Sequence, residues 1–109
     1  MGITKSDIFN AKQNRLANYF KVLGHPARLA ILEYVAKQEG CICNDLVDEL
    51  GLAQATISQH LKALKESGII QGTIEGKSVC YCINQEVWGS IQAEIKDLFK
   101  QELSVKSCC

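Results

Sequence analysis

Apolar residues recur at helical spacing along the first half of the chain, and this pattern predicts amphipathic helices. The first predicted helix extends from about Ser6, which can cap it, to Leu23, before the break at Gly24. The second extends from Pro26 to Gln38, because proline suits the first turn of a helix. The apolar positions that define these helices are Ile8, Phe9, Leu16, Tyr19, Phe20 and Leu23 in the first, and Leu29, Ile31, Leu32, Tyr34 and Val35 in the second.

Two more helices separated by a short turn follow. The pattern predicts a short helix from Asn44 to Leu50 and a longer one from Gln54 to Ser67, joined by the three-residue turn 51–53. The longer helix carries inward positions at spacings of four and three, which are Ile57, Leu61 and Leu64. Gly68 stands where a left-handed C-terminal cap belongs.

The last part of the chain predicts a hairpin and a final helix. Strands from Ile69 to Ile74 and from Ser78 to Ile83 flank the turn 75–77, and a helix follows from Gln85 to about Leu103. The element order therefore predicts a mainly α fold with a two-stranded β-hairpin, a winged helix-turn-helix. We expect one domain over residues 1–103 and a cysteine-bearing tail over 104–109.

The first and last helices carry more apolar surface than a three-helix core needs. Their spare stripes predict a homodimer interface through these two helices; the alternative is that they complete a monomeric core. The last helix presents Trp88, Ile91, Ile95, Leu98 and Phe99 on its stripe. A chain of 109 residues has a marginal core of its own, so hiding more apolar surface in a dimer would stabilise it.

Charge and hydropathy narrow the class of protein. Twelve Lys and Arg balance twelve Asp and Glu, which excludes a strongly basic nucleic-acid binder overall but permits a local basic face. No apolar run is long enough to span a membrane, and the N-terminus lacks the apolar core of a signal peptide. We therefore expect a cytoplasmic protein with no membrane partner.

The fourth predicted helix has the composition of a DNA-reading helix. Such a helix needs polar side chains near its N-terminus and an apolar back, and Gln can pair bidentately with adenine. The candidate contacts to double-stranded DNA are Gln54, Thr56, Ser58, Gln59 and Lys62 on the helix, and Lys77 and Ser78 at the hairpin tip. The hairpin residues would contact the phosphate backbone. The alternative is a solvated helix with ordinary surface residues.

Four segments resemble one bacterial repressor family. Residues 23–32 (LGHPARLAIL) resemble the LxxPxRLxIL signature of the ArsR/SmtB family, and residues 45–64 are similar to its helix-turn-helix. Residues 68–70 are similar to the short segment that follows the helix-turn-helix in this family, and residues 75–77 are similar to its wing. The resemblance covers residues 10–103 and implies a homodimeric repressor, not an enzyme, that leaves its operator when an inducer binds. Ala53 departs from the family, which often has Ser as the helix cap.

Six cysteines in three pairs suggest which inducer binds. Thiolates suit soft ions, and residues 88–103 contain no His, so a zinc-type site on the last helix is not expected. The favoured ligands are Cys41, Cys43, Cys108 and Cys109, with Cys80 and Cys82 less favoured. Residues 41–43 resemble the CxC element of arsenic-responsive members, although Asn44 falls where a cysteine is often found. We expect As(III) or Sb(III) as inducer, and no organic cofactor.

Other roles for these residues stay open. A thiol-based redox or persulfide-sensing repressor of the same fold is the main alternative, although the positions of the cysteines in known members of that class correspond to Glu33 and Lys100. The pairs also lack the spacing of a structural zinc module. At the start of a helix, Cys41 and Cys43 would have lowered thiol pKa values. The alternative for this pair is that one of the two cysteines is a small buried apolar residue. The alternative for Cys108 and Cys109 is a tail without a role. His60 is expected to pack or to contact phosphate, and His25 to form a local hydrogen bond.

Overall fold

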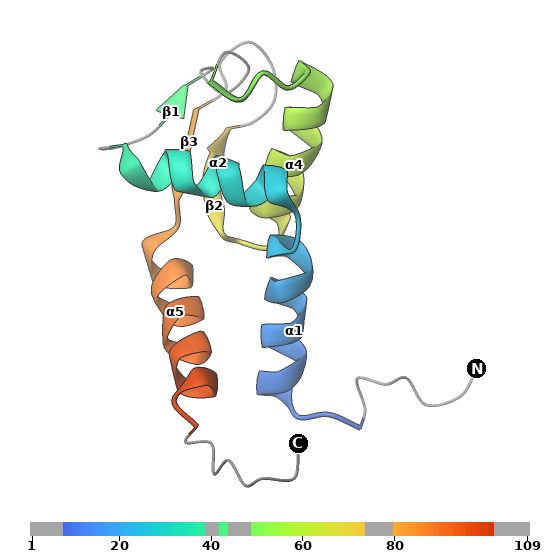
Figure 1. Ribbon diagram of the computed structural model, residues 1–109, viewed down its shortest axis with the longest axis vertical. Coiled ribbons are helices and arrows are strands. Elements are labelled where there is room, and N and C mark those ends of the chain that lie inside the picture. Colours follow the sequence, from blue (N-terminus) through green and yellow to red (C-terminus); the bar gives the residue numbers. More distant parts are fainter. Residues whose placement is uncertain (1–7, 39–41, 44–48, 74–79, 102–109) are drawn as a thin grey trace, which may run out of the picture.

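A computed structural model describes residues 8–38, 42–43, 49–73 and 80–101 (Figure 1). Its helices are α1 (Ala11–Leu23), α2 (Pro26–Lys37), α4 (Gln54–Glu66) and α5 (Gln85–Phe99). Its strands are β1 (Ile42–Cys43), β2 (Ile70–Thr73) and β3 (Cys80–Ile83). In Figure 1, α1 and α5 run side by side, and α2, α4 and the strands form the rest of the molecule above them.

The first helix begins later than predicted. Asn10 caps α1, since its side chain accepts a 2.7 Å hydrogen bond from the Gln13 backbone, and Gln13 accepts one from the Asn10 backbone in return. This reciprocal capping box satisfies two donors that a helix start leaves unpaired. Ser6 lies outside the described residues, so its predicted cap is not described, but residues 8–10 are not helical.

The boundaries of α2 and α4 confirm their predictions to within one residue. Pro26 opens α2, and the Nδ1 atom of His25 accepts a 3.0 Å hydrogen bond from the Ala27 backbone. This contact confirms the expected local role of His25. Gly68 follows α4 with φ +84°, the left-handed conformation expected of a C-terminal cap.

The region before α4 corrects one prediction. Residues 41–43 were expected to begin a helix, but Ile42 and Cys43 form β1 and pair antiparallel with β3. Glu49 and Leu50 are helical, and residues 44–48 of the predicted short helix lie outside the described residues. Two consecutive residues carry no alternating pattern, which is why pattern analysis did not find this strand.

The predicted hairpin is present and gains a third strand. The sheet has the order β1-β3-β2, with Ile70 opposite Ile83 and Gly72 opposite Tyr81. The expected turn at 75–77 lies outside the described residues. The final helix α5, capped by Asn84, ends at Phe99 rather than near Leu103.

The hydrophobic core joins the two central helices to the sheet. It contains Ile31, Leu32 and Val35 of α2, Ile57, Leu61 and Leu64 of α4, and Ile42, Ile69, Ile70, Tyr81 and Ile91. Large apolar side chains of α1 and α5 lie outside it: Phe20 is 40% exposed, Leu98 47% and Phe99 74%. None of the described helices is long and apolar enough to cross a membrane.

Candidate nucleic-acid interface and cysteine positions

Helix α4 has one buried face and one polar face. Its buried side chains Ile57, Leu61 and Leu64 confirm the predicted apolar back and fix the helix on the core. The predicted contact residues lie on the other side: Gln54, Thr56, Gln59 and Lys62 are exposed and Ser58 is half-buried. The Gln54 side-chain amide donates a 3.2 Å hydrogen bond to the Ser58 hydroxyl. The polar face is therefore available to a ligand while the helix is held from behind.

The start of α4 leaves its backbone N–H groups accessible. Ala53 has the extended conformation of an N-cap, with φ −62° and ψ 146°, and of the described side chains none caps this end. A helix N-terminus with uncapped N–H groups carries partial positive charge and favours phosphate. This geometry supplements the modest number of cations on the helix.

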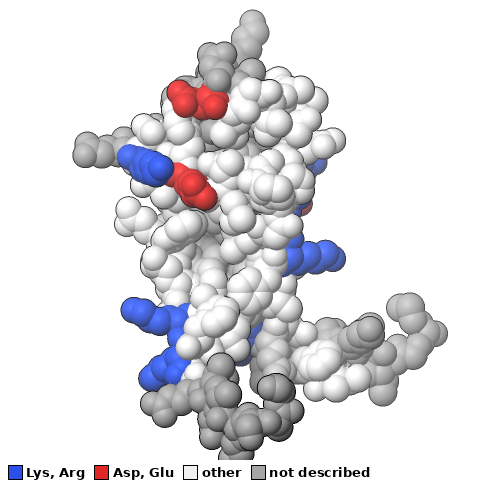
Figure 2. Space-filling model, in the orientation of Figure 1, with Lys and Arg blue, Asp and Glu red and all other residues white. Residues whose placement is uncertain are grey.

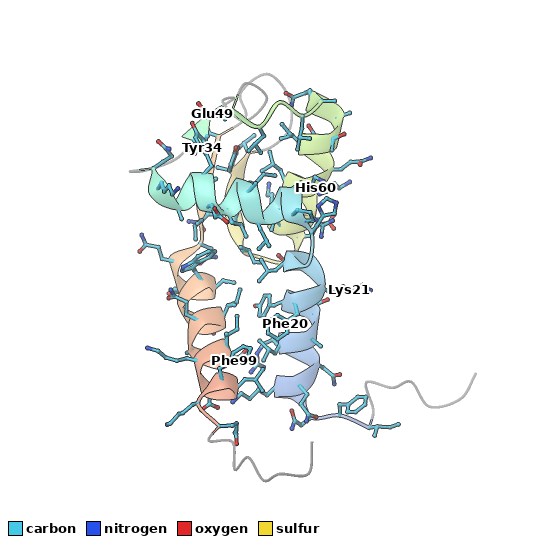
Figure 3. The ribbon with its side chains drawn as sticks, viewed as in Figure 1. Phe20, Lys21, Tyr34, Glu49, His60 and Phe99 are labelled. Atoms are coloured by element: carbon cyan, nitrogen blue, oxygen red, sulfur yellow. The ribbon has the colours of Figure 1, made fainter. Side chains whose placement is uncertain are left out.

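His60 anchors α4 to the start of α2. Its side chain is buried, its Nδ1 atom accepts a 3.1 Å hydrogen bond from Arg28 Nε, and its ring lies 4.4 Å from that of His25 (Figure 3). Arg28 also donates a 3.0 Å hydrogen bond to the Val22 carbonyl. Burial and the neighbouring His25 and Arg28 lower the pKa of His60, so the neutral imidazole is favoured. His60 therefore has the predicted packing role.

The remaining predicted DNA contacts, Lys77 and Ser78, lie outside the described residues. On the face shown in Figure 2, Lys and Arg side chains occur in separate groups rather than as one large patch. This distribution agrees with a net charge of zero.

Strand pairing brings cysteines from distant parts of the sequence together. Cys43 of β1 is the register partner of Cys80 of β3, and Cys82 lies two residues further along β3. The Cys80 sulfur is in a disulfide, whereas Cys82 is a half-buried free thiol whose sulfur lies 3.9 Å from the Gln71 side-chain amide.

The helix-start argument for the first pair is thus wrong for Cys43, which belongs to a strand. Cys41, Cys108 and Cys109 lie outside the described residues. Among the side chains that are described, no three His, Cys, Asp or Glu residues are grouped closely enough to hold a metal ion. Pattern analysis had no means of pairing Cys43 with Cys80, because a register between distant strands is a tertiary property.

An apolar groove lies between α2 and α5 and was not predicted as a feature. It has a volume of about 820 Å³ and is lined mainly by apolar side chains, among them Leu23, Leu29, Leu32, Trp88 and Ile95. Leu29, one of the apolar positions that predicted α2, is 47% exposed there. Exposed apolar surface of this kind often marks a protein interface.

Comparison with known proteins finds regulators that share this architecture. Residues 25–71 match the model of the bacterial regulatory protein, arsR family. An uncharacterised HTH-type transcriptional regulator of Methanocaldococcus jannaschii is 42% identical over 66 residues, which are 60% of this chain and 73% of that protein. The biofilm growth-associated repressor of Xylella fastidiosa is 31% identical over 83 residues, 76% of this chain and 71% of that protein.

The fold itself is also known from experiment. A crystal structure of an ArsR family transcriptional regulator superposes with a TM-score of 0.64 at 22% identity, covering 84% of this chain and 96% of that one. At this identity the likeness supports the fold alone. It confirms the predicted winged helix-turn-helix.

Proposed function

The chain belongs to the arsR family of bacterial regulatory proteins, and from this premise we propose a cytoplasmic, homodimeric repressor that a thiophilic metalloid, As(III) or Sb(III), releases from operator DNA. The observation that carries the proposal is helix α4. Its apolar back is buried while Gln54, Thr56 and Gln59 stay exposed beyond an uncapped N-terminus. These side chains can read base edges, and the first turn can meet a phosphate.

Exposed apolar side chains support the homodimer. Phe20 on α1 and Leu98 and Phe99 on α5 lie largely outside the core of one chain. A second copy that covered them would bury apolar surface worth roughly 25 cal/mol per Å². A dimer would also present two α4 helices to two half-sites of one operator.

The cysteines support a soft inducer. Trivalent arsenic and antimony take thiolate ligands, and the chain supplies six cysteines. The proposed ligands are drawn from Cys41, Cys43, Cys108 and Cys109. Cys80 and Cys82 are added because they belong to β3, the strand that pairs with β1. Release of DNA by tenfold requires about 1.4 kcal/mol of coupling between the two sites.

DNA release by arsenite tests this function. The reduced full-length protein would be bound to a fluorescent duplex that it has itself selected from a random library, and the anisotropy followed as sodium arsenite or zinc chloride is added. We expect release with arsenite and retention with zinc. If the protein selects no duplex, the repressor proposal fails; if arsenite leaves the complex intact, the metalloid proposal fails.

A second candidate is a thiol-based redox or persulfide-sensing repressor of the same fold. The disulfide at Cys80 favours it, because it shows that this thiol has a partner within bonding distance. The same anisotropy assay separates the candidates. A redox sensor would release DNA on oxidation with a low-molecular-weight disulfide, regain it on reduction, and ignore arsenite.

A further inference from the structure

Two imidazole rings and one guanidinium group meet where the start of α2 lies against α4. The ring centroids of His25 and His60 are 4.4 Å apart, and Arg28 Nε donates a 3.1 Å hydrogen bond to His60 Nδ1. Figure 3 shows His60 at this junction. His25 is exposed, Arg28 is half-buried and His60 is buried. We name these three residues the α2–α4 cluster.

The hydrogen bonds of the cluster determine which ring nitrogens can donate. The Nδ1 atom of His25 accepts a 3.0 Å hydrogen bond from the Ala27 backbone, and the Nδ1 atom of His60 accepts the one from Arg28. A neutral imidazole that accepts at Nδ1 carries its proton at Nε2. Both Nε2 atoms are therefore N–H donors, and neither makes a hydrogen bond to a described residue.

Arg28 adds a positive charge and a third donor to the cluster. Its Nε and Nη1 atoms donate to His60 and to the Val22 carbonyl, which leaves Nη2 without a partner among the described residues. No described carboxylate forms an ion pair with Arg28. Neither Nη2 of Arg28 nor Nε2 of His60 is fully buried. The charge of Arg28 and the three N–H groups are therefore available to an anion from outside the chain.

The cluster lies beside the polar face of α4. His60 follows the exposed Thr56 by four residues, and residues four apart share one side of a helix. A helix about 10–12 Å in diameter fills a major groove about 12 Å wide, so its flanks face the phosphates of the groove walls. With α4 in the groove, this flank would bring the cluster to one strand of the DNA backbone.

We propose that His25, Arg28 and His60 together bind one phosphate of the operator backbone. This inference rests on the proposed binding of DNA by α4 and does not depend on the inducer. The phosphate oxygens would accept hydrogen bonds from the two Nε2–H groups and from Nη2 of Arg28, whose charge strengthens the contact. Phosphate contacts position a protein without reading the base sequence, so this site would fix how α2 and α4 lie on the duplex.

The salt dependence of DNA affinity tests the role of Arg28. Anisotropy titrations of the reduced full-length protein, at several potassium chloride concentrations, would use the selected duplex and one of unrelated sequence. Arg28→Gln keeps a donor near Nε for His60 but removes the charge. It should lower the affinity for both duplexes at least about tenfold and reduce the slope of log affinity against log salt by about 1 per bound chain. Arg28→Lys keeps the charge and should keep the slope.

His25→Asn tests the cluster through an exposed residue. Asparagine keeps an acceptor that can cap α2, but it places no N–H group where Nε2 of His25 lies. This variant should bind both duplexes roughly threefold or more weakly. Its salt slope should stay at the wild-type value, because a neutral donor neutralises no phosphate.

Lys96→Gln is the matched control for the lost charge. Lys96 is an exposed cation of α5 that forms no ion pair with a described residue, so its replacement should leave affinity and slope unchanged. Urea unfolding shows which variants are folded, and if Arg28→Gln is not, His25→Asn decides alone.

Normal affinity of folded Arg28→Gln or His25→Asn overturns the phosphate site and leaves DNA binding by α4 standing. A loss in Arg28→Gln without the change of slope, or a loss confined to the selected duplex, also overturns the site. A wild type that selects no duplex overturns the proposed function itself.

Discussion

The Nδ1 atom of His60 can accept the hydrogen bond from Arg28 only while the imidazole is neutral. Protonation would place an N–H opposite the guanidinium N–H and a positive charge beside Arg28 and His25. Burial adds to this effect, and together these causes lower the pKa of His60 in the folded protein. The contact joins α2 to α4, so its strength bears on how firmly α4 is held against the core.

Stability should therefore decrease in mild acid. The unfolded chain, with an ordinary histidine pKa near 6.5, binds the proton more readily than the folded chain does. The stabilisation is complete above that pH and is lost as the pH falls below it, toward the lower pKa of the folded state. Urea unfolding between pH 7.5 and 5.5 measures the slope. His60→Asn keeps an acceptor near Nδ1 and should flatten the slope; an unchanged slope would assign the pH dependence to other groups.

Ala53 offers a matched pair of substitutions at the start of α4. Its extended backbone suits a capping side chain, so Ala53→Ser and Ala53→Asp should each raise the free energy of unfolding by roughly 0.5–2 kcal/mol. Their effects on DNA should differ, because a carboxylate at this end repels the phosphate that the free N–H groups would bind. Urea unfolding and anisotropy measure the two effects. Equal DNA affinity of the Ser and Asp variants would show that no phosphate lies there.

At the scale of the elements, the hairpin depends on one glycine. Gly72 has φ +130°, a conformation that residues with a Cβ rarely adopt, and a Cβ there would overlap the Cys80 carbonyl oxygen and lie 2.8 Å from Tyr81 Cα. Gly72→Ala should therefore lower the free energy of unfolding by roughly 1–3 kcal/mol or more and weaken the β2–β3 pairing. Urea unfolding at fixed protein concentration measures the loss.

Gly89 in α5 is the matched control for Gly72. Among the described residues, apart from its chain neighbours and the nearby helix backbone, no atom lies within 4 Å of the place where its Cβ would stand. A helix interior also favours Ala over Gly by roughly 0.5–1 kcal/mol. Gly89→Ala should therefore stabilise the protein. A similar loss in both variants would mean that the Gly72 effect does not come from the hairpin.

How far each element was predictable depends on whether its signal is local. The ends of α2 and α4 are marked by residues within or next to each helix: Pro26 begins α2, and Gly68 follows the end of α4. Both helices were therefore predicted to within one residue. The start of α1 was missed because Asn10 and Gln13 cap each other one turn after Ser6. Strand β1 was missed because the strand with which it pairs, β3, lies far along the chain.

The candidate DNA-contact residues and the cysteines also differ in how far the sequence could predict their positions. The polar face of α4 follows from side-chain periodicity within one helix, and the structure leaves Gln54, Thr56 and Gln59 exposed as predicted. The pairing of Cys43 with Cys80 depends on the register of two strands and on which face the core occupies. No pattern within either Cys-x-Cys segment contains that information, so the ranking of Cys80 and Cys82 below the other cysteines as ligands stays a prediction.

At the scale of the whole molecule, polar contacts tie α1 to α5. Arg15 donates a 2.8 Å hydrogen bond to Glu94, which raises the pKa of the Arg15 guanidinium, and Lys12 pairs with Asp97. These ion pairs align the two helices but contribute little to stability, as is usual at a surface, since Lys12, Arg15 and Asp97 are exposed and only Glu94 is half-buried. The exposed apolar side chains of the same helices are accessible to a second copy of the chain.

Charge introduced on this surface should separate the dimer. Phe20→Glu and Leu98→Glu each place a carboxylate on an exposed apolar position, so neither variant should unfold the chain, but a partner could no longer cover it without burying a charge. Light scattering during size-exclusion chromatography should give a mass near twice 12.0 kDa for the wild type and near 12.0 kDa for both variants. Operator affinity should fall by at least about tenfold, because two linked half-sites would no longer be bound together.

Lys21→Glu is the control for the charge itself. Lys21 follows Phe20 in α1 and points away from α5 (Figure 3), so this larger change of charge should leave the mass at the dimer value. A wild type of 12.0 kDa would refute the homodimer outright. A dimer that survives both Phe20→Glu and Leu98→Glu would instead place the interface on another surface, for which the groove lined by Leu29, Trp88 and Ile95 is the next candidate.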